Sequence, residues 1–315
     1  MIARILRGSP SFAGVTYNTN KIDRDKGELM LAANFGPLQA LTNLRPQDYV
    51  NYLVMVSGLN KGISDPQFHA TISAKGRTYD KHNLTKIAVL WLNEMGYGEQ
   101  PYLVVFHKDT GNNHVHIVST RVDRNGVKIP SDFERLRSVK AINKVLGYDY
   151  GLLYKFSTRA QFLMILESKG FLGTDPDERL IQERISKFKL DKGRAAEIRE
   201  ILRELKNDPR FKYVLKERYN IDLLFHAAEG KKPYGYTIID HDEKKVFKGS
   251  EVYPLKELLD VNEQIATPVK EEIITEEYMT TPAYIQSVWI ADDVDDQQIH
   301  GMRRRRQKKA RTNTR

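Results

Sequence analysis

Two apolar segments joined by a short polar link restrict the fold more than any other feature of this sequence. The segments read PYLVVFH (101–107) and HVHIVSTRV (114–122), and the six residues between them read KDTGNN. Asp, Gly and Asn favour tight turns, so we expect the segments to be antiparallel strands of one hairpin. A doubly wound sheet has parallel strands and would need a long crossover at this point. The hairpin therefore predicts an antiparallel sheet.

Strands and helices alternate around this hairpin. Period-two alternation predicts two further strands, MIARILRG (1–8) and FHATISA (68–74). Apolar residues at helical spacing predict three helices, over 46–58, 83–96 and 131–147. The last helix starts with Ser131 and Glu134, which are spaced as a capping box. The segment SPSFAGVTYNTNKID (9–23) is rich in turn formers and is expected to be a loop, or a turn into another strand. The predicted fold class is α+β, with a central antiparallel sheet and flanking helices.

The chain changes in character after residue 157. One helix is expected over 158–169 and a mostly helical, highly charged segment over 178–228. A second hairpin follows, with YGYTIID and VFKGSEV on either side of HDEKK. From about residue 262 the composition shifts toward Glu, Thr, Asp and Gln, which predicts disorder. We therefore expect three parts: a domain over 1–157, a helical and β-hairpin accessory region over 158–261, and a disordered tail, acidic and then basic, over 262–315.

Charge is distributed unevenly along the chain. The 50 Lys and Arg residues outnumber the 41 Asp and Glu residues, which gives a net charge of +9 and favours an anionic partner. Residues 1–160 have a net charge of +8, residues 161–302 of −7, and the final RRRRQKKARTNTR (303–315) of +8. The chain is therefore basic, then acidic, then basic, and each part needs its own interpretation.

Several classes of protein are excluded by composition. The absence of Cys excludes disulfides, Cys-ligated zinc, iron–sulfur clusters and a thiol nucleophile, so any metal ion must be held by His and carboxylate side chains. No run of 18 apolar residues is present, which argues against a membrane span. The sequence MIARILRGSPSFAG lacks the apolar core of a secretory signal, so we expect a cytoplasmic protein.

Three of the eight His residues lie in the predicted hairpin: His107, His114 and His116. His114 and His116 are two apart on one strand, so their side chains project from the same face, and the hairpin brings His107 beside them. Three imidazoles arranged in this way can hold a metal ion and leave coordination positions open, and Mn, Zn, Ni and Fe accept such ligands. The alternative is that the histidines line a polar face of the sheet. Asp109 suits a role in orienting an imidazole or as a general base, and equally suits an Asx turn.

The string H-x-D-x4-H-x-H, formed by these histidines and Asp109, resembles the three-histidine motif of the relaxase or mobilisation nuclease family of conjugative and mobilisable DNA elements. SFAGVTYNTNK resembles the segment that holds the nucleophilic Tyr of that family, and FHATIS resembles its middle motif, a strand that ends in Ser. PYGYTIIDHDEKKVFKGSEV resembles the hairpin found after the nuclease core in related mobilisation proteins. Asn113 departs from the family pattern, because many members have Pro before the second His of the motif.

The resemblance implies a relaxase nuclease domain over 1–157, with Tyr17 as the nucleophile. Tyr17 would attack one phosphodiester at the nic site of a plasmid or mobile-element transfer origin, leaving a 5′-phosphotyrosyl bond and a free 3′-OH for conjugative transfer. A phenol with a pKa of about 10 is a poor nucleophile. A divalent metal, Mg or Mn first and Zn next, is therefore expected to polarise the phosphate. Tyr79 is the reserve candidate for the nucleophile.

The resemblance also suggests how DNA and partner proteins bind. The basic charge of residues 1–160 would follow single-stranded DNA around the nick. The residues expected to contact DNA are Lys21, Ser73, Arg121 and Arg124, with His69 as an accessory residue. The basic tail is expected to be either a DNA arm or a transfer signal for a type IV secretion coupling protein. Relaxosome accessory proteins are further expected partners, and the acidic middle of the chain is the candidate surface for them.

Two other functions fit the same residues. One is a metal-dependent phosphodiesterase or nuclease that activates water and forms no Tyr adduct. The other is a noncatalytic DNA-binding accessory protein in which the histidines are structural. A covalent protein–DNA adduct that depends on Tyr17 distinguishes the relaxase from both.

Overall fold

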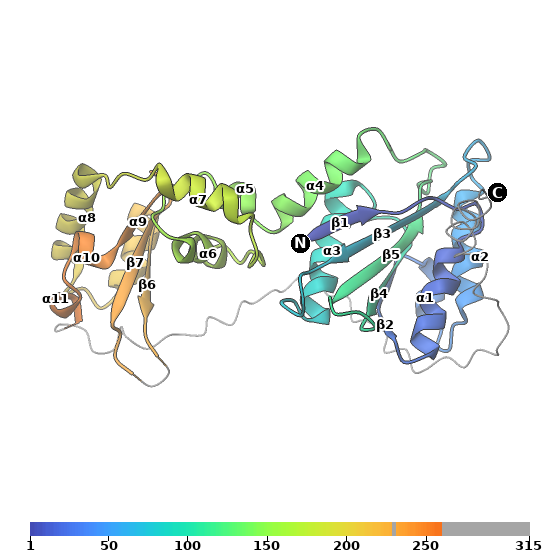
Figure 1. The fold of residues 1–315 in the computed structure, drawn as a ribbon, viewed down its shortest axis with the longest axis horizontal. Helices are drawn as coiled ribbons and strands as arrows, with labels where there is room; N and C mark the ends of the chain where they lie inside the picture. The colour runs from blue at the N-terminus through green and yellow to red at the C-terminus, as the bar shows by residue number, and fades with distance from the viewer. Residues whose placement is uncertain (229–230, 260–315) are drawn as a thin grey trace, which may run out of the picture.

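The computed structural model describes residues 1–228 and 231–259, and its first half is built on one antiparallel sheet. The strands are β1 (Ile2–Ile5), β2 (Gly27–Ala33), β3 (Gln67–Ser73), β4 (Tyr102–His107) and β5 (His114–Thr120). Their order across the sheet is β1-β3-β5-β4-β2, and each neighbouring pair is antiparallel. The predicted hairpin is β4 and β5, which lie between β3 and β2 (Figure 1). The α+β fold class is confirmed.

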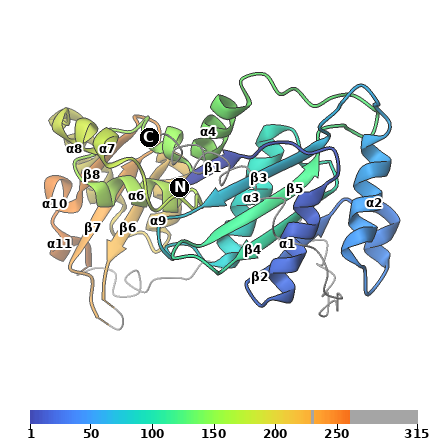
Figure 2. The same ribbon diagram turned by 45° about the vertical axis from the view of Figure 1, so that its right-hand side comes forward.

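Helices cover both faces of this sheet (Figure 2). One face carries α1 (Ala13–Asp23), the short 3-10 helix η1 (Gly36–Ala40) and α2 (Pro46–Ser57), and the other carries α3 (Lys81–Met95) and α4 (Glu134–Val145). Successive residues of a strand point to opposite faces. Leu103 and Val118 therefore pack with the α1 and α2 side chains, whereas Val104 and Ile117 join the core under α3. The face under α1 and α2 is the one that carries the histidines.

The remaining described residues form a second lobe (Figure 1). Its helices are α5 (Tyr148–Gly151), α6 (Arg159–Ser168), α7 (Glu178–Ser186), α8 (Lys192–Leu205), α9 (Phe211–Tyr219), α10 (Gly249–Val252) and α11 (Leu255–Leu259). Its strands, β6 (Ile221–His226), β7 (Gly235–Asp240) and β8 (Lys245–Lys248), form an antiparallel sheet in the order β6-β7-β8. The second predicted hairpin is β7 and β8. α7, α8 and α9 confirm that 178–228 is mostly helical, but β6 at the end of this segment was not predicted, because a short apolar run does not distinguish a strand from a buried helix.

The two lobes are joined through the chain around residue 155. The backbone N–H of Lys155 donates to the carbonyl of Lys244 at 2.8 Å, and the N–H of Val246 donates to the carbonyl of Lys155 at 3.0 Å. Tyr154 and Phe156 belong to the same buried cluster as the sheet face under α3. The expected boundary after residue 157 stays a prediction, and the residues just before it already pair with the second sheet.

The loop or turn expected over 9–23 was wrong, because residues Ala13–Asp23 form helix α1. Phe12 stands at its N-cap with left-handed backbone angles (φ 53°), and its side chain is fully buried in the core between α1 and α2. The buried positions of α1 are Gly14, Val15, Asn18 and Thr19. Because only one of these four is a large apolar residue, the sequence shows no apolar stripe at helical spacing.

Helix α4 does not begin with the predicted capping box. Phe133 occupies the N-cap with left-handed angles (φ 49°), and no side chain caps the helix. Glu134 instead accepts hydrogen bonds from Arg121 and Tyr97. Ser131 contributes its carbonyl oxygen to the turn, 3.3 Å from the Glu134 nitrogen.

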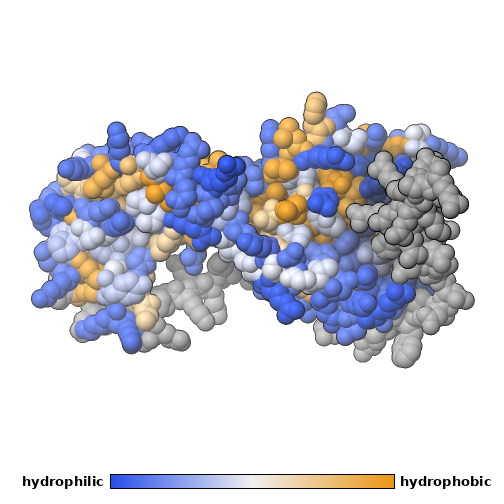
Figure 3. Space-filling model, in the orientation of Figure 1, coloured by the Kyte–Doolittle hydropathy of each residue, from blue (hydrophilic) through white to orange (hydrophobic). Residues whose placement is uncertain are grey.

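Apolar side chains gather on the outside of α4 and β1 (Figure 3). The exposed apolar residues there are Ile2, Phe133, Leu136 and Val139. Within 1–228 and 231–259, no helix is both long enough and apolar enough to cross a membrane. The predicted disordered tail (262–315), including its basic end, lies outside the described residues.

Candidate active site

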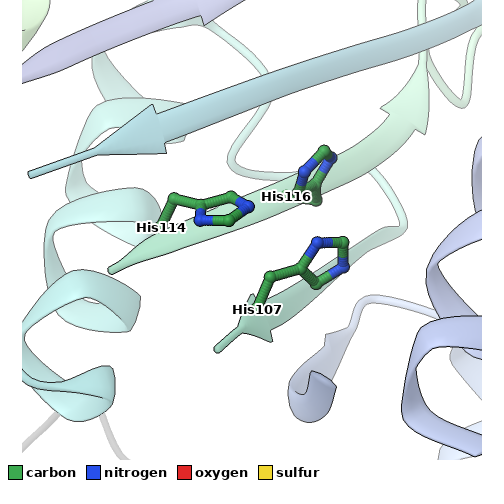
Figure 4. Close-up of side chains that lie close together, drawn as sticks. All are labelled: His107, His114 and His116. Carbon is green, nitrogen blue, oxygen red and sulfur yellow. The ribbon is translucent and has the colours of Figure 1, made fainter. Parts of the chain in front are cut away.

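Three imidazoles meet where β4 ends and β5 begins (Figure 4). His107 pairs with His114 across the hairpin, and His116 follows two residues later on the same face of the sheet. The ligand-capable nitrogen atoms of the three residues all lie within 4.8 Å of one another. His107 and His116 are buried, and His114 is partly exposed at the rim. The hairpin therefore gathers the three residues into one cluster that solvent or a ligand reaches past His114.

The contacts of these imidazoles suit a metal ion. The Nε2 atom of His107 is buried and has no hydrogen-bond partner within the described residues. The Nδ1 atom of His114 lies 3.0 Å from the carbonyl oxygen of Asn112, so Nδ1–H donates there and Nε2 keeps its lone pair. A buried polar atom without a partner is destabilising unless a ligand satisfies it. The residues therefore fit a divalent metal held by three nitrogen atoms.

Burial keeps His107 and His116 neutral at physiological pH. Burial, followed by the charges of neighbouring histidines, lowers the pKa of His107 to about 4 and the pKa of His116 to about 2. A metal ion binds the neutral form of imidazole. The folded protein thus presents these two ligands ready for a metal, without a proton to remove.

A fourth histidine contacts the cluster from β3. The Nε2 atom of His69 lies 3.0 Å from the Nδ1 atom of His116. Burial lowers the pKa of His69 to about 4, so this is a hydrogen bond between two neutral rings. It occupies Nδ1 of His116 and leaves Nε2 of His116 for a metal. A hydrogen bond to the far nitrogen is the usual way in which proteins orient a metal-binding imidazole.

Tyr17 lies beside the histidines, on α1. Its ring centre is 6.1 Å from that of His107 and 5.9 Å from that of His116. The side chain is partly exposed. Lys21 follows one helical turn later, and its ammonium group is 5.7 Å from the centre of the Tyr17 ring. α1 therefore presents a tyrosine and a lysine to the same end of the sheet.

Two glycines allow α1 and β2 to approach the histidines this closely. A Cβ atom at Gly14 would lie 2.8 Å from Oε1 of Gln67 and 3.1 Å from Nδ1 of His69. The Gly14 N–H donates to the same Gln67 oxygen at 2.7 Å, which ties the start of α1 to β3. Gly27 pairs with His107, and a Cβ atom there would lie 3.3 Å from Cδ2 of His107. Both positions therefore favour glycine because of close approach.

Asp109 forms an ion pair with Lys21 at 2.9 Å. Burial would raise the pKa of Asp109, but the hydrogen bond and charge of Lys21, with the charge of His107, outweigh it and hold this pKa below its usual range. A carboxylate with a lowered pKa is a weak proton acceptor. The lowered pKa therefore argues against Asp109 as a general base, and the observed partner of Asp109 is Lys21 rather than an imidazole.

The other expected residues divide into two groups. Ser73 pairs with His114 across β3 and β5, so it lies at the cluster. Arg121 and Arg124 follow the opposite end of β5, beyond Thr120. Arg121 forms a two-point ion pair with Glu134, and Arg124 donates to the carbonyl of Asn34 at 2.6 Å. The structure does not bring these two arginines to the histidines.

The reserve candidate, Tyr79, is buried, and its hydroxyl accepts a hydrogen bond from the Thr174 N–H at 2.8 Å. Three contributors to the site were missed in the sequence: Gly14, Gly27 and the carbonyl of Asn112. Glycine in a strand often marks a close backbone approach, so Gly27 offered a signal. The role of Asn112 depends on loop conformation, and nothing in the sequence indicates it.

The sheet thus holds a partly exposed tyrosine beside three histidines that could bind a metal ion, which places a potential nucleophile next to a potential metal site. Residues 17–152 match the family model described as "Relaxase: MobA/VirD2-like, nuclease domain". The matched segment starts at Tyr17 and contains all three clustered histidines. Comparisons with curated proteins and with solved structures give no match. Residues 17–152 therefore form a nuclease domain of the relaxase type, a domain family that implies DNA-nicking activity.

Proposed function

We propose that this relaxase nicks one DNA strand at a transfer origin by transesterification, with Tyr17 as the nucleophile. The position of Tyr17 carries the proposal, because its ring lies about equally far from those of His107 and His116, at 6.1 and 5.9 Å. A phosphate bound at the histidine cluster would thus lie next to the phenol. Holding the phenol and the phosphate side by side makes their reaction effectively unimolecular, which lowers the entropic part of the barrier.

Attack by Tyr17 on the scissile phosphate forms one bond to phosphorus and breaks another. The phenolic oxygen of Tyr17 forms a bond to phosphorus while the bond from phosphorus to the 3′ oxygen breaks. Overall, the phenolic proton is transferred to the 3′ oxygen, which leaves a free 3′-OH and a 5′-phosphotyrosyl bond. One phosphate ester replaces another, so reversal of the reaction rejoins the strand.

A metal ion at the histidine cluster would supply the positive charge that activates the phosphate for attack by a phenol. A divalent metal held by His107, His114 and His116 would polarise the scissile phosphate and offset the charge that develops on it. The resemblance to relaxases favours Mg or Mn, and the all-imidazole ligand set makes Zn the next candidate. The three ligands are neutral, so they do not reduce the positive charge at the site. His69 holds the ring of His116 in place.

Residues around the cluster complete the site. Lys21, held by Asp109, is placed to stabilise negative charge on the phenol or the phosphate. Ser73 is placed beside His114 to donate to a phosphate oxygen. Arg124 remains a proposed DNA contact further along the strand. The pairing of Arg121 with Glu134 favours a structural role over a phosphate contact.

The proposed partners follow from this reaction. Single-stranded DNA at a transfer origin is the substrate, and relaxosome accessory proteins present it. The basic residues 303–315 are proposed to contact DNA or a type IV secretion coupling protein. We place the protein in the cytoplasm, where such DNA is processed.

The test incubates the protein with single-stranded DNA that spans the transfer origin, in the presence of Mn or Mg. We expect a protein–DNA adduct that survives denaturation, is lost in Tyr17→Phe and is kept in Tyr234→Phe, a change at an exposed tyrosine of the second lobe. Cleavage without an adduct, retained in Tyr17→Phe, would support the water-using nuclease instead. Binding without cleavage under Mg, Mn and Zn would support the noncatalytic accessory protein.

A further inference from the structure

A cavity in the second lobe lies at the connection between α7 and α8, away from the histidines. Its volume is about 470 Å³, and the connection, Lys155 and β8 bound it. Four lysines line it: Lys155, Lys189, Lys192 and Lys245. The backbone pairing of Lys155 with β8 brings the first of these to the others. We call this site the lysine cavity.

The positive charge of the lysine cavity is mostly unpaired. Lys245 forms ion pairs with Asp191 at 2.8 Å and with Glu243 at 3.0 Å. The ammonium groups of the other three lysines have no ion pair or hydrogen bond within 1–228 and 231–259. The cavity therefore concentrates positive charge although residues 161–302 have a net charge of −7.

Asp191, the acidic residue of the lining, is already engaged. Its carboxylate caps α8 by accepting from the Arg194 N–H at 3.0 Å, and it also accepts from Lys245 at 2.8 Å. These bonds leave Lys155, Lys189 and Lys192 without a counter-charge from the lining. An anion that enters the cavity would supply the missing partner.

An aromatic ring lies among these lysines. Phe188 lines the cavity and is only partly buried. It belongs to none of the three apolar cores of the described chain, although its neighbour Leu190 packs against the core of the second lobe. Proteins that bind single strands combine lysines for the phosphates with an aromatic ring on which a base stacks. A site for a simple anion would not need the ring.

We propose that the lysine cavity binds a single DNA strand, with phosphates at Lys155, Lys189 and Lys192 and a base against Phe188. Its volume is in the range that takes one nucleotide. This binding lies outside the nicking reaction and requires neither Tyr17 nor the histidines. It would give the enzyme a second site that binds the DNA strand, separate from the candidate active site.

Fluorescence anisotropy of the full-length protein with an oligothymidylate tests the proposal. We expect the triple variant K155Q/K189Q/K192Q to bind about tenfold more weakly, and the slope of log affinity against log salt to fall by about 2, as for three lost single-strand phosphate contacts. The control K169Q/K231Q/K256Q removes the same charge from exposed lysines outside the cavity and should change affinity less than about twofold. Equal losses in the two triple variants would overturn the proposal.

The ring and the source of the phosphate are tested separately. Phe188→Leu should weaken binding about fivefold, and Phe188→Tyr should retain it. Inorganic phosphate and thymidine monophosphate should compete poorly with the oligothymidylate. An unchanged affinity in Phe188→Leu, or stronger binding of an oligouridylate RNA, would overturn the single-stranded DNA assignment.

The outcome is separable from that of the proposed function. Thermal unfolding shows whether each variant is folded, and nicking of a short origin oligonucleotide should persist in the lysine variants. If the wild-type protein does not nick origin DNA but its lysine cavity still binds the oligothymidylate, only the proposed role of Tyr17 is overturned.

Discussion

The Nε2 atom of His69 lies 3.0 Å from the Nδ1 atom of His116, and both rings are buried. The two residues are 47 positions apart and face each other because β3 and β5 are neighbouring strands. Imidazoles that bind metals are commonly oriented by a carboxylate or carbonyl at the far nitrogen. Here a second neutral imidazole takes that place.

His69→Ala should weaken metal binding, because it frees the ring of His116 to turn. We expect the affinity for Mn²⁺, measured by isothermal titration calorimetry, to fall by about tenfold. His82→Ala, at an exposed position on α3, is the matched control and should leave the affinity unchanged. If His69→Ala binds Mn²⁺ as the wild type does, the contact with His116 has no orienting role.

Arg121→Ala should destabilise the fold rather than remove a DNA contact. The side chain of Arg121 is 13% exposed and that of Glu134 is 9% exposed, and the pair joins the end of β5 to α4. Removal of one partner leaves the other charge buried, which costs about 3 kcal/mol of unfolding free energy. Denaturant titration measures this loss, with the exposed Arg124→Ala as a control that should cost about 1 kcal/mol or less. A stable Arg121→Ala variant with weaker DNA binding would restore Arg121 as a DNA contact.

The metal-free protein should lose stability as the pH falls from 7 toward 5. Burial lowers the pKa values of His69 and His107 to about 4 and that of His116 to about 2, whereas an unfolded histidine titrates near about 6.5. Below that pH the unfolded state binds protons that the folded state does not, so the stability present at higher pH is lost. The thermal midpoint should drop by several degrees per pH unit, and His116→Gln should drop less steeply. A midpoint that rises between pH 7 and 5 would contradict the lowered pKa values of His69, His107 and His116.

Tyr154→Phe should weaken the junction at which the chain around residue 155 packs against the second sheet. The hydroxyl of Tyr154 lies 2.7 Å from that of Tyr150 and 2.7 Å from Nδ1 of His241, and Nε2 of His241 lies 2.8 Å from Asp222. Loss of the hydroxyl leaves Nδ1 of a buried histidine without its partner and should cost about 2 kcal/mol. Differential scanning calorimetry measures the effect, and Tyr234→Phe is the exposed control. Identical unfolding profiles for the two variants would show that this chain of hydrogen bonds does not hold the junction.

The hairpin and its histidines were predictable because they depend on local patterns. Apolar residues fill β4 and β5, and a six-residue link fixes their pairing, so the facing of His107 and His114 follows from the sequence. Helix α1 was not predictable in this way. Its buried side uses Gly14 and Asn18, whose fit depends on Gln67 and β3 rather than on any pattern within the helix. Tyr17 was therefore singled out by resemblance while its position on a helix was missed.

Long-range partners explain the remaining differences. Glu134 was expected to cap its own helix, yet its carboxylate binds Arg121, 13 residues earlier in the chain. A count of basic residues treats Arg121 and Lys21 alike, although Arg121 pairs with Glu134 away from the histidines, whereas Lys21 pairs with Asp109 beside Tyr17. Such distinctions depend on burial and register, which charge counts do not contain.

The most direct test of the account maps the covalent bond. The protein is incubated with origin DNA and Mn²⁺, the DNA is digested to nucleotides, and tryptic peptides are analysed by mass spectrometry. Peptide 8–21 contains Tyr17 as its sole tyrosine. We predict that this peptide carries a nucleotide joined through its 5′ phosphate. DNA that is cleaved while peptide 8–21 stays unmodified would contradict the account.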